Sequence, residues 1–202
     1  MNNNNNLIFT IVPLDDSNLG IILSTSGNVF RAVIHKSSED SVHSLLRALY
    51  YLHPDADKLD TTCRVEYFTR TDDNALNTSN TVCYEDIKYR ADIYNIREDT
   101  SFVPAKASLF WYEENDCFTN LTITKSEESN PNPILHIEAN LYCQEPEHWE
   151  YYIPYADFCT IVLNGCEKII ADIGQEEYNK RSGNKPFKPG YISFLKNITT
   201  NS

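Results

Sequence analysis

Glycine is scarce in this chain of 202 residues, which contains only 6 copies, and none stands in a phosphate-binding pattern. Neither GxxxxGK[ST] nor GxGxxG occurs, so the sequence offers no loop of backbone N–H groups to hold a nucleotide. A GxSxG nucleophile pattern is missing too. These absences argue against nucleotide-dependent enzymes, and we expect neither a cofactor nor a catalytic site.

Metal-binding patterns are also missing. The 6 cysteines form no CxxC, and Cys159 and Cys166 stand seven positions apart, about 10.5 Å along a helix, too far to share a metal or a disulfide. The histidines lie on different predicted elements without ligand spacing. They are His35, His43, His53, His136 and His148. We therefore expect no bound metal and reduced cysteines that serve packing.

Long apolar runs are absent, since no stretch approaches the roughly 18 uninterrupted apolar residues that a membrane helix requires. The start, with Asn2–Asn6 and the short apolar run Leu7–Val12, lacks the basic region of a signal peptide. We expect a cytoplasmic protein without a membrane partner, whose first six residues, 1–6, are disordered.

The apolar pattern that is present predicts one α+β domain over residues 1–202. Leu7–Val12, Leu19–Ser24 and Val29–Ile34 are separated by turn residues and predict hairpins. A first helix is predicted from the apolar spacing between Val42 and Leu52, with Ser37, Ser38, Glu39 and Asp40 at its start.

The middle of the chain alternates as strands do. The alternating sets are Cys63-Val65-Tyr67, Ile87-Tyr89-Ala91-Ile93 (which also fits a helix), Ala107-Leu109-Trp111, Phe118-Leu121-Ile123 and Ile134–Leu141. Their short connections favour an antiparallel meander of four or five strands.

A second helix is predicted after Pro154, which suits a first-turn position, and it continues to Ile173. Gly174 interrupts it, and Gln175–Lys180 resumes it. Residues 183–190 then read as a Pro/Gly linker to a carboxyl-terminal segment that docks on the core. The expected fold is an antiparallel sheet packed against two main helices.

Acidic residues dominate the charge, with 29 Asp and Glu against 17 Lys and Arg and a net charge of −12. The excess lies in residues 61–150, which hold 17 acidic and 7 basic residues. Such a field repels phosphates, which disfavours direct nucleic-acid binding, and it attracts a basic protein. The simpler interpretation is that the charge only keeps the protein soluble.

Carboxylates are interleaved with aromatic residues at several places, of which Glu145–Tyr152 is the longest. Aromatic anchors with carboxylates suit an interface for a basic partner. Alternation along a strand, with aromatics inside and carboxylates outside, accounts equally well for the pattern. The residues that we predict to bind the partner are Asp72, Asp73, Glu85, Asp86, Glu113, Glu114, Asp116, Glu127 and Glu128.

The carboxyl third carries Tyr155-Ala156-Asp157-Phe158 at the start of a long apolar helix, then Gly174–Tyr178 and Pro189–Leu195. This segment resembles the closing part of small bacterial immunity proteins. In size and acidity the whole chain is similar to the immunity proteins paired with contact-dependent growth inhibition toxins. The resemblance implies a non-enzymatic protein that binds its cognate basic toxin domain, commonly a nuclease, and blocks the active site.

Two other hypotheses stay open, and the sequence leaves the oligomeric state undecided. One is a hydrolase or nuclease whose site is assembled from scattered residues such as His136, His148 and nearby carboxylates. The other is an acidic regulatory protein that mimics nucleic acid and occupies a DNA-binding host protein.

Overall fold

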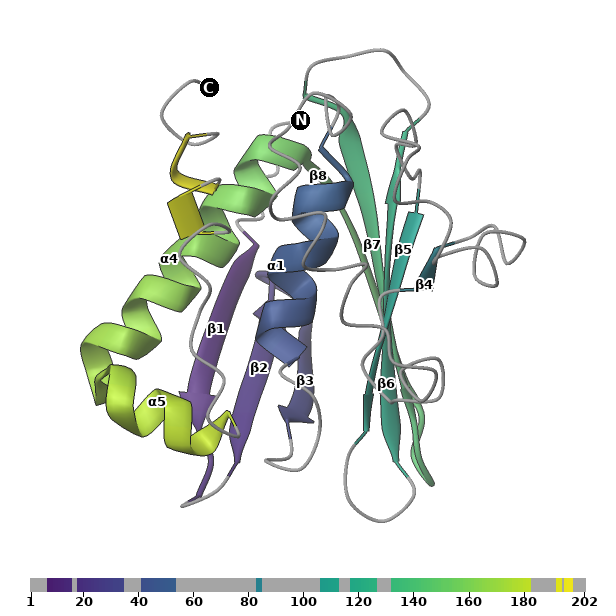
Figure 1. Cartoon of the computed structure of the whole chain (residues 1–202). Coiled ribbons are helices and arrows are strands. Elements are labelled where there is room, and N and C mark those ends of the chain that lie inside the picture. Colours follow the sequence, from purple (N-terminus) through teal and green to yellow (C-terminus); the bar gives the residue numbers. More distant parts are fainter. Residues whose placement is uncertain are drawn as a thin grey trace, which may run out of the picture.

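The computed structural model describes residues 7–15, 18–34, 41–53, 83–84, 106–112, 117–126, 132–182, 192–193 and 195–197 and shows an α+β protein (Figure 1). The α+β class and the antiparallel pairing are as predicted, but the strands form two sheets with helices packed against them, where one sheet was expected. The strands are β1 (Ile8–Pro13), β2 (Leu19–Ser24), β3 (Val29–Ile34), β4 (Cys83–Tyr84), β5 (Lys106–Tyr112), β6 (Phe118–Lys125), β7 (Ile134–Tyr142) and β8 (Glu147–Pro154), and the helices are α1 (Ser41–Tyr51), α4 (Tyr155–Ile173) and α5 (Gln175–Arg181).

The first sheet has the order β1-β2-β3 and consists of two hairpins, which confirms the prediction. Residues alternate between its two faces, so Phe9, Leu23 and Phe30 meet across the strands on one face and are almost fully buried. At the second turn the amide of Asn28 donates to Thr25 Oγ1 over 3.3 Å. Figure 1 shows α1 and α4 on one side of this sheet.

The second sheet has the order β4-β5-β6-β7-β8, an antiparallel meander in which each strand pairs with the next along the chain. Its inner face packs into the core, and the core residues of this face are Ala107, Leu109, Leu121, Ile123, Leu135, Ile137, Ala139, Trp149 and Ile153. Two predicted strands, at Cys63-Val65-Tyr67 and Ile87–Ile93, lie outside the described residues.

The long helix α4 follows β8 directly, with Pro154 at the N-cap, one position before the first-turn position predicted for it. Its free N–H groups find partners in the connection before β7. The amide of Tyr155 donates to the Pro133 carbonyl, and that of Ala156 donates to Asn132 Oδ1, both over 2.9 Å. Gly174, at φ 80°, ends α4 and precedes α5, as predicted.

Side chains of α1, α4 and both sheets share one hydrophobic core. Two contacts fix how α4 sits in it. Tyr155 Oη donates to the Leu49 carbonyl of α1 over 2.6 Å, and Gly165 lies so close to β1 that an added Cβ would stand 2.5 Å from Phe9 Cδ1.

The described part of the carboxyl-terminal segment also reaches the core. Leu195 is fully buried, and Lys196 Nζ lies 2.9 Å from Glu167 Oε1 of α4. Residues 183–190, the predicted linker, and the residues predicted to start the first helix lie outside the described residues. None of the described helices is both long enough and apolar enough to cross a membrane.

Candidate functional site

The nine carboxylates predicted to bind a partner lie outside the residues that the structure describes, so that site stays a prediction. They are Asp72, Asp73, Glu85, Asp86, Glu113, Glu114, Asp116, Glu127 and Glu128. The search for a binding surface therefore turns to the exposed side chains that the structure does describe.

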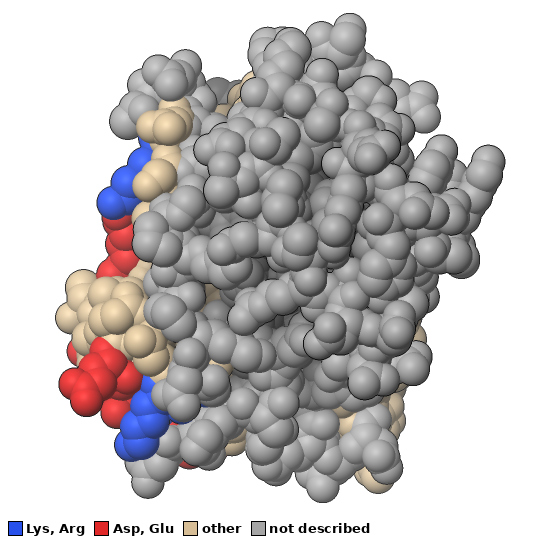
Figure 2. Space-filling model, viewed as in Figure 1, with Lys and Arg blue, Asp and Glu red and all other residues tan. Residues whose placement is uncertain are grey.

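The side of the molecule formed by α4 and α5 is a balanced charged surface. Figure 2 shows Lys, Arg, Asp and Glu mixed along this side. Most of these charges are paired locally, as in Lys168–Asp172, Arg181–Glu177 and Lys196–Glu167 at 2.7–2.9 Å. Exposed pairs such as Lys168–Asp172 and Lys196–Glu167 contribute about 0–1 kcal/mol each and are typical of a solvated helix surface. This side has no unusual group of residues that would recognise a ligand.

The outward face of the second sheet is different. Alternation along β6, β7 and β8 places apolar residues in the core and a set of polar and aromatic residues, together with Ile134, on the opposite face. We call this set the outer sheet face, and it comprises Asn120, Thr122, Thr124, Ile134, His136, Glu138, Asn140, Tyr142, His148, Glu150 and Tyr152.

Two carboxylates face each other at the centre of the outer sheet face. Glu138 on β7 and Glu150 on β8 are direct cross-strand partners. The Cβ atoms of such partners lie about 4.5–5.5 Å apart, and like charges in this arrangement destabilise a sheet. Both side chains are exposed, so a cationic group of another molecule can reach them.

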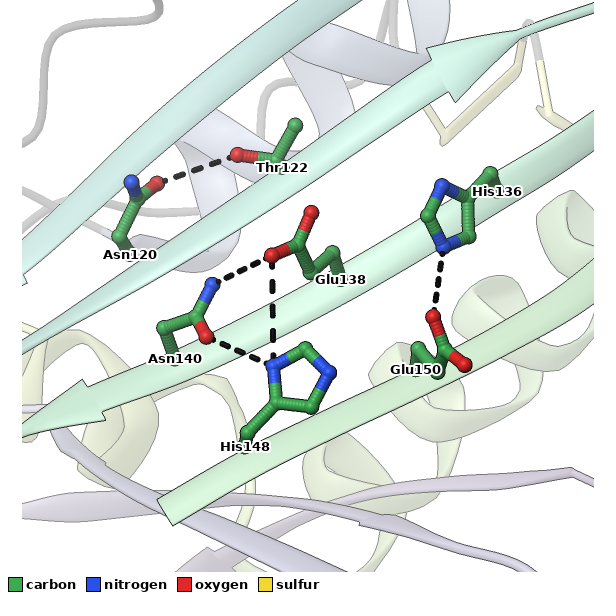
Figure 3. A network of polar contacts seen from close by, with 7 residues as sticks. All are labelled: Asn120, Thr122, His136, Glu138, Asn140, His148 and Glu150. Carbon is green, nitrogen blue, oxygen red and sulfur yellow. Dashed lines mark hydrogen bonds and ion pairs between the residues drawn. The ribbon is translucent and has the colours of Figure 1, made fainter. Parts of the chain in front are cut away.

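A histidine stands beside each carboxylate (Figure 3). His136 Nε2 lies 3.3 Å from Glu150 Oε2, while His148 Nδ1 lies 4.0 Å from Glu138 Oε1. Asn140 connects the second pair: its Nδ2 donates to Glu138 Oε1 over 3.0 Å, and its Oδ1 lies 2.7 Å from His148 Nδ1 and accepts a hydrogen bond when that nitrogen carries a proton. The five side chains thus form two groups, and each group joins residues of the adjacent strands β7 and β8.

Aromatic rings flank these polar groups. Tyr152 stacks on His136 with ring centroids 4.4 Å apart and an interplanar angle of 9°, and Phe118 stacks on Tyr142 with centroids 4.6 Å apart. Tyr152 is 62% exposed, far more than an aromatic ring usually is in a packed protein. The outer sheet face therefore combines a large exposed aromatic ring, carboxylates and hydrogen-bonding groups.

The charged groups of the outer sheet face are open to solvent. The side chains of Glu150 and His148 are 56% and 55% exposed, so water screens their charges. In the described part of the chain, no group of three or more His, Cys, Asp or Glu side chains could hold a metal ion.

The environment of Cys159 does not suit a nucleophile. Cys159 is buried beside Tyr155, and burial raises the pKa of its thiol from 9.0 to about 12, opposite to what a reactive thiolate needs. Cys117, Cys143 and Cys166, like Cys159, form no disulfide.

Comparison with known proteins adds no relative, because no family model, no curated protein and no solved structure matches the chain.

The structure brings His136 and His148 to one face, together with Glu138 and Glu150, as the enzyme hypothesis required of its residues. The residues predicted to bind a partner do not include any of these four, although Glu145–Tyr152 is the longest segment in which carboxylates and aromatic residues are interleaved. Within it Trp149 points into the core, whereas Glu150 and Tyr152 point outward. Strand alternation, which places aromatic residues inside and carboxylates outside, thus accounts for Trp149 and Glu150 but not for the exposed ring of Tyr152.

Proposed function

We propose that this chain is a protein-binding inhibitor of the immunity type, which neutralises a basic toxin domain by covering its active site. The observation that carries the proposal is the pair Glu138 and Glu150, which face each other on the exposed sheet beside the His136–Tyr152 stack. The carboxyl third resembles immunity proteins, and this resemblance implies that the partner is a toxin, which we propose to be a nuclease.

The chemistry of the outer sheet face fits an arginine of the partner. A guanidinium group is planar, presents several N–H donors and pairs with carboxylates in a two-pronged geometry. Placed between Glu138 and Glu150, it would remove their mutual repulsion, and the exposed ring of Tyr152 offers a surface for stacking. Such aromatic and charged contacts are the ones that dominate binding energy in protein interfaces.

The net charge of −12 supports the same class of partner. It accelerates encounter with a basic protein, and this effect weakens with salt. A nuclease that binds a phosphate backbone must itself present a basic surface near its active site. Covering that surface with carboxylates would block the substrate through the same groups that provide recognition.

The test starts from the full-length tagged chain as bait, with lysate of its own source, over a series of salt concentrations. A second bait carries Glu138→Gln and Glu150→Gln, which remove charge but keep shape. A control bait carries Asp172→Asn and Glu176→Gln, which remove the same charge from the exposed surface of α4 and α5. A fourth bait reverses the charge at Glu113, Glu114 and Asp116 and tests the surface predicted from the sequence.

We expect one basic partner in a stoichiometric complex that weakens as salt rises. A charge-assisted hydrogen bond contributes about 1.5–3 kcal/mol, so the Glu138/Glu150 bait should bind roughly tenfold to a hundredfold more weakly than the control bait. The isolated partner should degrade nucleic acid, and an equimolar amount of the chain should stop it. Equal binding by all baits would exclude both surfaces, and a partner that stays active in the complex would refute inhibition.

One specific observation favours the alternative that the chain is an enzyme: His136 and His148 lie on the same face as Glu138 and Glu150. It predicts that the purified chain hydrolyses its substrate without a partner. The test is incubation of the purified chain with RNA and with single- and double-stranded DNA. If the chain degrades one of them, and if His136→Ala and His148→Ala each abolish this activity, the chain is a nuclease and the proposed function is wrong. Recovery of a DNA-binding host protein in the pull-down would instead favour nucleic-acid mimicry.

A further inference from the structure

The outward face of the first sheet is apolar, unlike that of the second. The strand register places Ile8, Ser24 and Val29 in one row, Thr10, Ile22 and Arg31 in the next, and Val12, Gly20 and Val33 in a third. Leu14 extends the third row, because its side chain lies against Gly20, where an added Cβ would stand 3.1 Å from Leu14 Cδ2. We call these ten residues the apolar sheet face.

Three large aliphatic side chains of the apolar sheet face are exposed to solvent. Ile8 is 54%, Val29 is 52% and Leu14 is 51% exposed, and Val12, Ile22 and Val33 are partly exposed between them. Soluble monomers rarely expose a contiguous apolar surface of more than a few hundred Å². The apolar sheet face therefore has the properties of a surface that another molecule covers.

Its charge identifies the occupant. The apolar sheet face holds one cation, Arg31, and no carboxylate, although the chain contains 29 Asp and Glu residues and has a net charge of −12. A strongly acidic protein repels its own copies over most of its surface. Two copies can approach closely only where carboxylates are missing, and the apolar sheet face is such a place.

We propose that the apolar sheet face is the contact between two copies of this chain in a symmetric dimer. In a two-fold interface the same patch meets itself, so it has to be free of like charges that would oppose each other and flat enough to pack on itself. Two such sheets would stack with aliphatic side chains interdigitated, as the inner faces of a β-sandwich do, about 10 Å apart. Arg31 is exposed on β3, the end strand of this sheet, and can place its apolar stem over the interface and keep its guanidinium in water.

This dimer is independent of the proposed function, because it uses the other sheet. It also has the opposite salt dependence. Binding of a basic partner weakens as salt rises, whereas a contact between two chains of charge −12 strengthens when salt screens their repulsion. The two proposals can therefore fail separately.

The test measures the mass of the purified full-length chain by sedimentation equilibrium from about 1 µM to about 100 µM, at low and at high salt. One variant carries Ile8→Glu with Val29→Glu, and another carries Ile8→Lys with Val29→Lys. The matched control is Ile134→Glu, which replaces an aliphatic residue 40% exposed on the outer sheet face. Circular dichroism and thermal unfolding show whether each variant folds, and the single change Val29→Thr replaces any double variant that does not.

We expect a dimer for the wild type and for Ile134→Glu, with tighter association at high salt. Each double variant should raise the dissociation constant at least about a hundredfold, because each change occurs twice in a symmetric interface, and Val29→Thr should raise it several-fold. If both the glutamate and the lysine double variants lose the dimer, the cause is the placement of charged groups in a buried face and not the change in net charge. A wild type that is monomeric at every concentration, or a dimer that survives both double variants, would overturn the proposal.

Discussion

Replacing Gly165 by alanine tests the close approach between α4 and β1. Gly165 is buried in the middle of α4, and its missing side chain leaves room for β1. An alanine Cβ would stand 2.5 Å from Phe9 Cδ1 and 3.0 Å from the Phe9 carbonyl oxygen. The ring can rotate slightly, but the carbonyl belongs to a strand paired with β2 along its whole length, from Ile8 to Pro13. Relief of the overlap therefore requires α4 and β1 to separate.

Two opposing terms set the size of the effect. In an exposed helix interior, Gly→Ala stabilises by about 1 kcal/mol, because alanine has a smaller backbone entropy in the unfolded chain. Overpacking a close-packed core costs about 1–3 kcal/mol. Because the clash involves the backbone, we take the overpacking cost as about 2 kcal/mol, which leaves a net loss of about 1 kcal/mol in the free energy of unfolding. For a chain of this size that corresponds to a melting temperature lower by roughly 2–4 °C.

Urea unfolding followed by circular dichroism provides the measurement, with Asn164→Ala as the control. Asn164 is the preceding residue of α4 and is exposed, so its replacement gains helix propensity without a clash and should stabilise by about 0.5 kcal/mol. The two neighbouring alanine substitutions should thus have effects of opposite sign. If Gly165→Ala stabilises the chain as Asn164→Ala does, the close packing of β1 on α4 is wrong.

Two further predictions concern the junction of α4 with α1. Tyr155→Phe should lower the free energy of unfolding by about 1–3 kcal/mol in the same urea assay, because the Leu49 carbonyl loses its 2.6 Å hydrogen bond inside the core; an unchanged midpoint would show that water reaches this carbonyl. Cys159 has a folded-state pKa of about 12 against 9.0 in water, so its contribution to stability is complete below about pH 9 and is lost as the pH rises toward 12. The unfolding free energy measured against pH should therefore fall more steeply above pH 9 in the wild type than in Cys159→Ala, by about 1.4 kcal/mol per pH unit, and parallel curves would contradict the burial of this thiol.

Most of the described fold could be predicted because its signals are local. The alternation in Leu19–Ser24 and Val29–Ile34 identifies strands, and the spacing of apolar residues from Tyr155 to Ile173 identifies a helix, before any tertiary contact is known. The cap of α4 could not be found in this way. Its partner Asn132 is 24 residues from Ala156 in the sequence, and only the fold brings the two together.

Only part of the outer sheet face could be predicted from the sequence. The alternation of His136, Glu138 and Asn140 shows that they share a face, but it does not show which residues of β8 stand opposite them. The pairing of Glu138 with Glu150 depends on the register between two strands, which the turn and the core set together. Charge density along the chain favoured carboxylates in turns instead, because a run of charges is visible without any knowledge of register.

The direct passage from β8 into α4 has a mechanical consequence. Pro154 is the last residue of the strand and Tyr155 the first of the helix, so no loop separates the exposed ring of Tyr152 from the buried helix. Hydrogen bonds to Pro133 and Asn132 hold the first two amides of that helix. A force applied to the outer sheet face therefore passes into the core rather than stretching a linker, and the strand cannot be peeled away without extracting α4 as well.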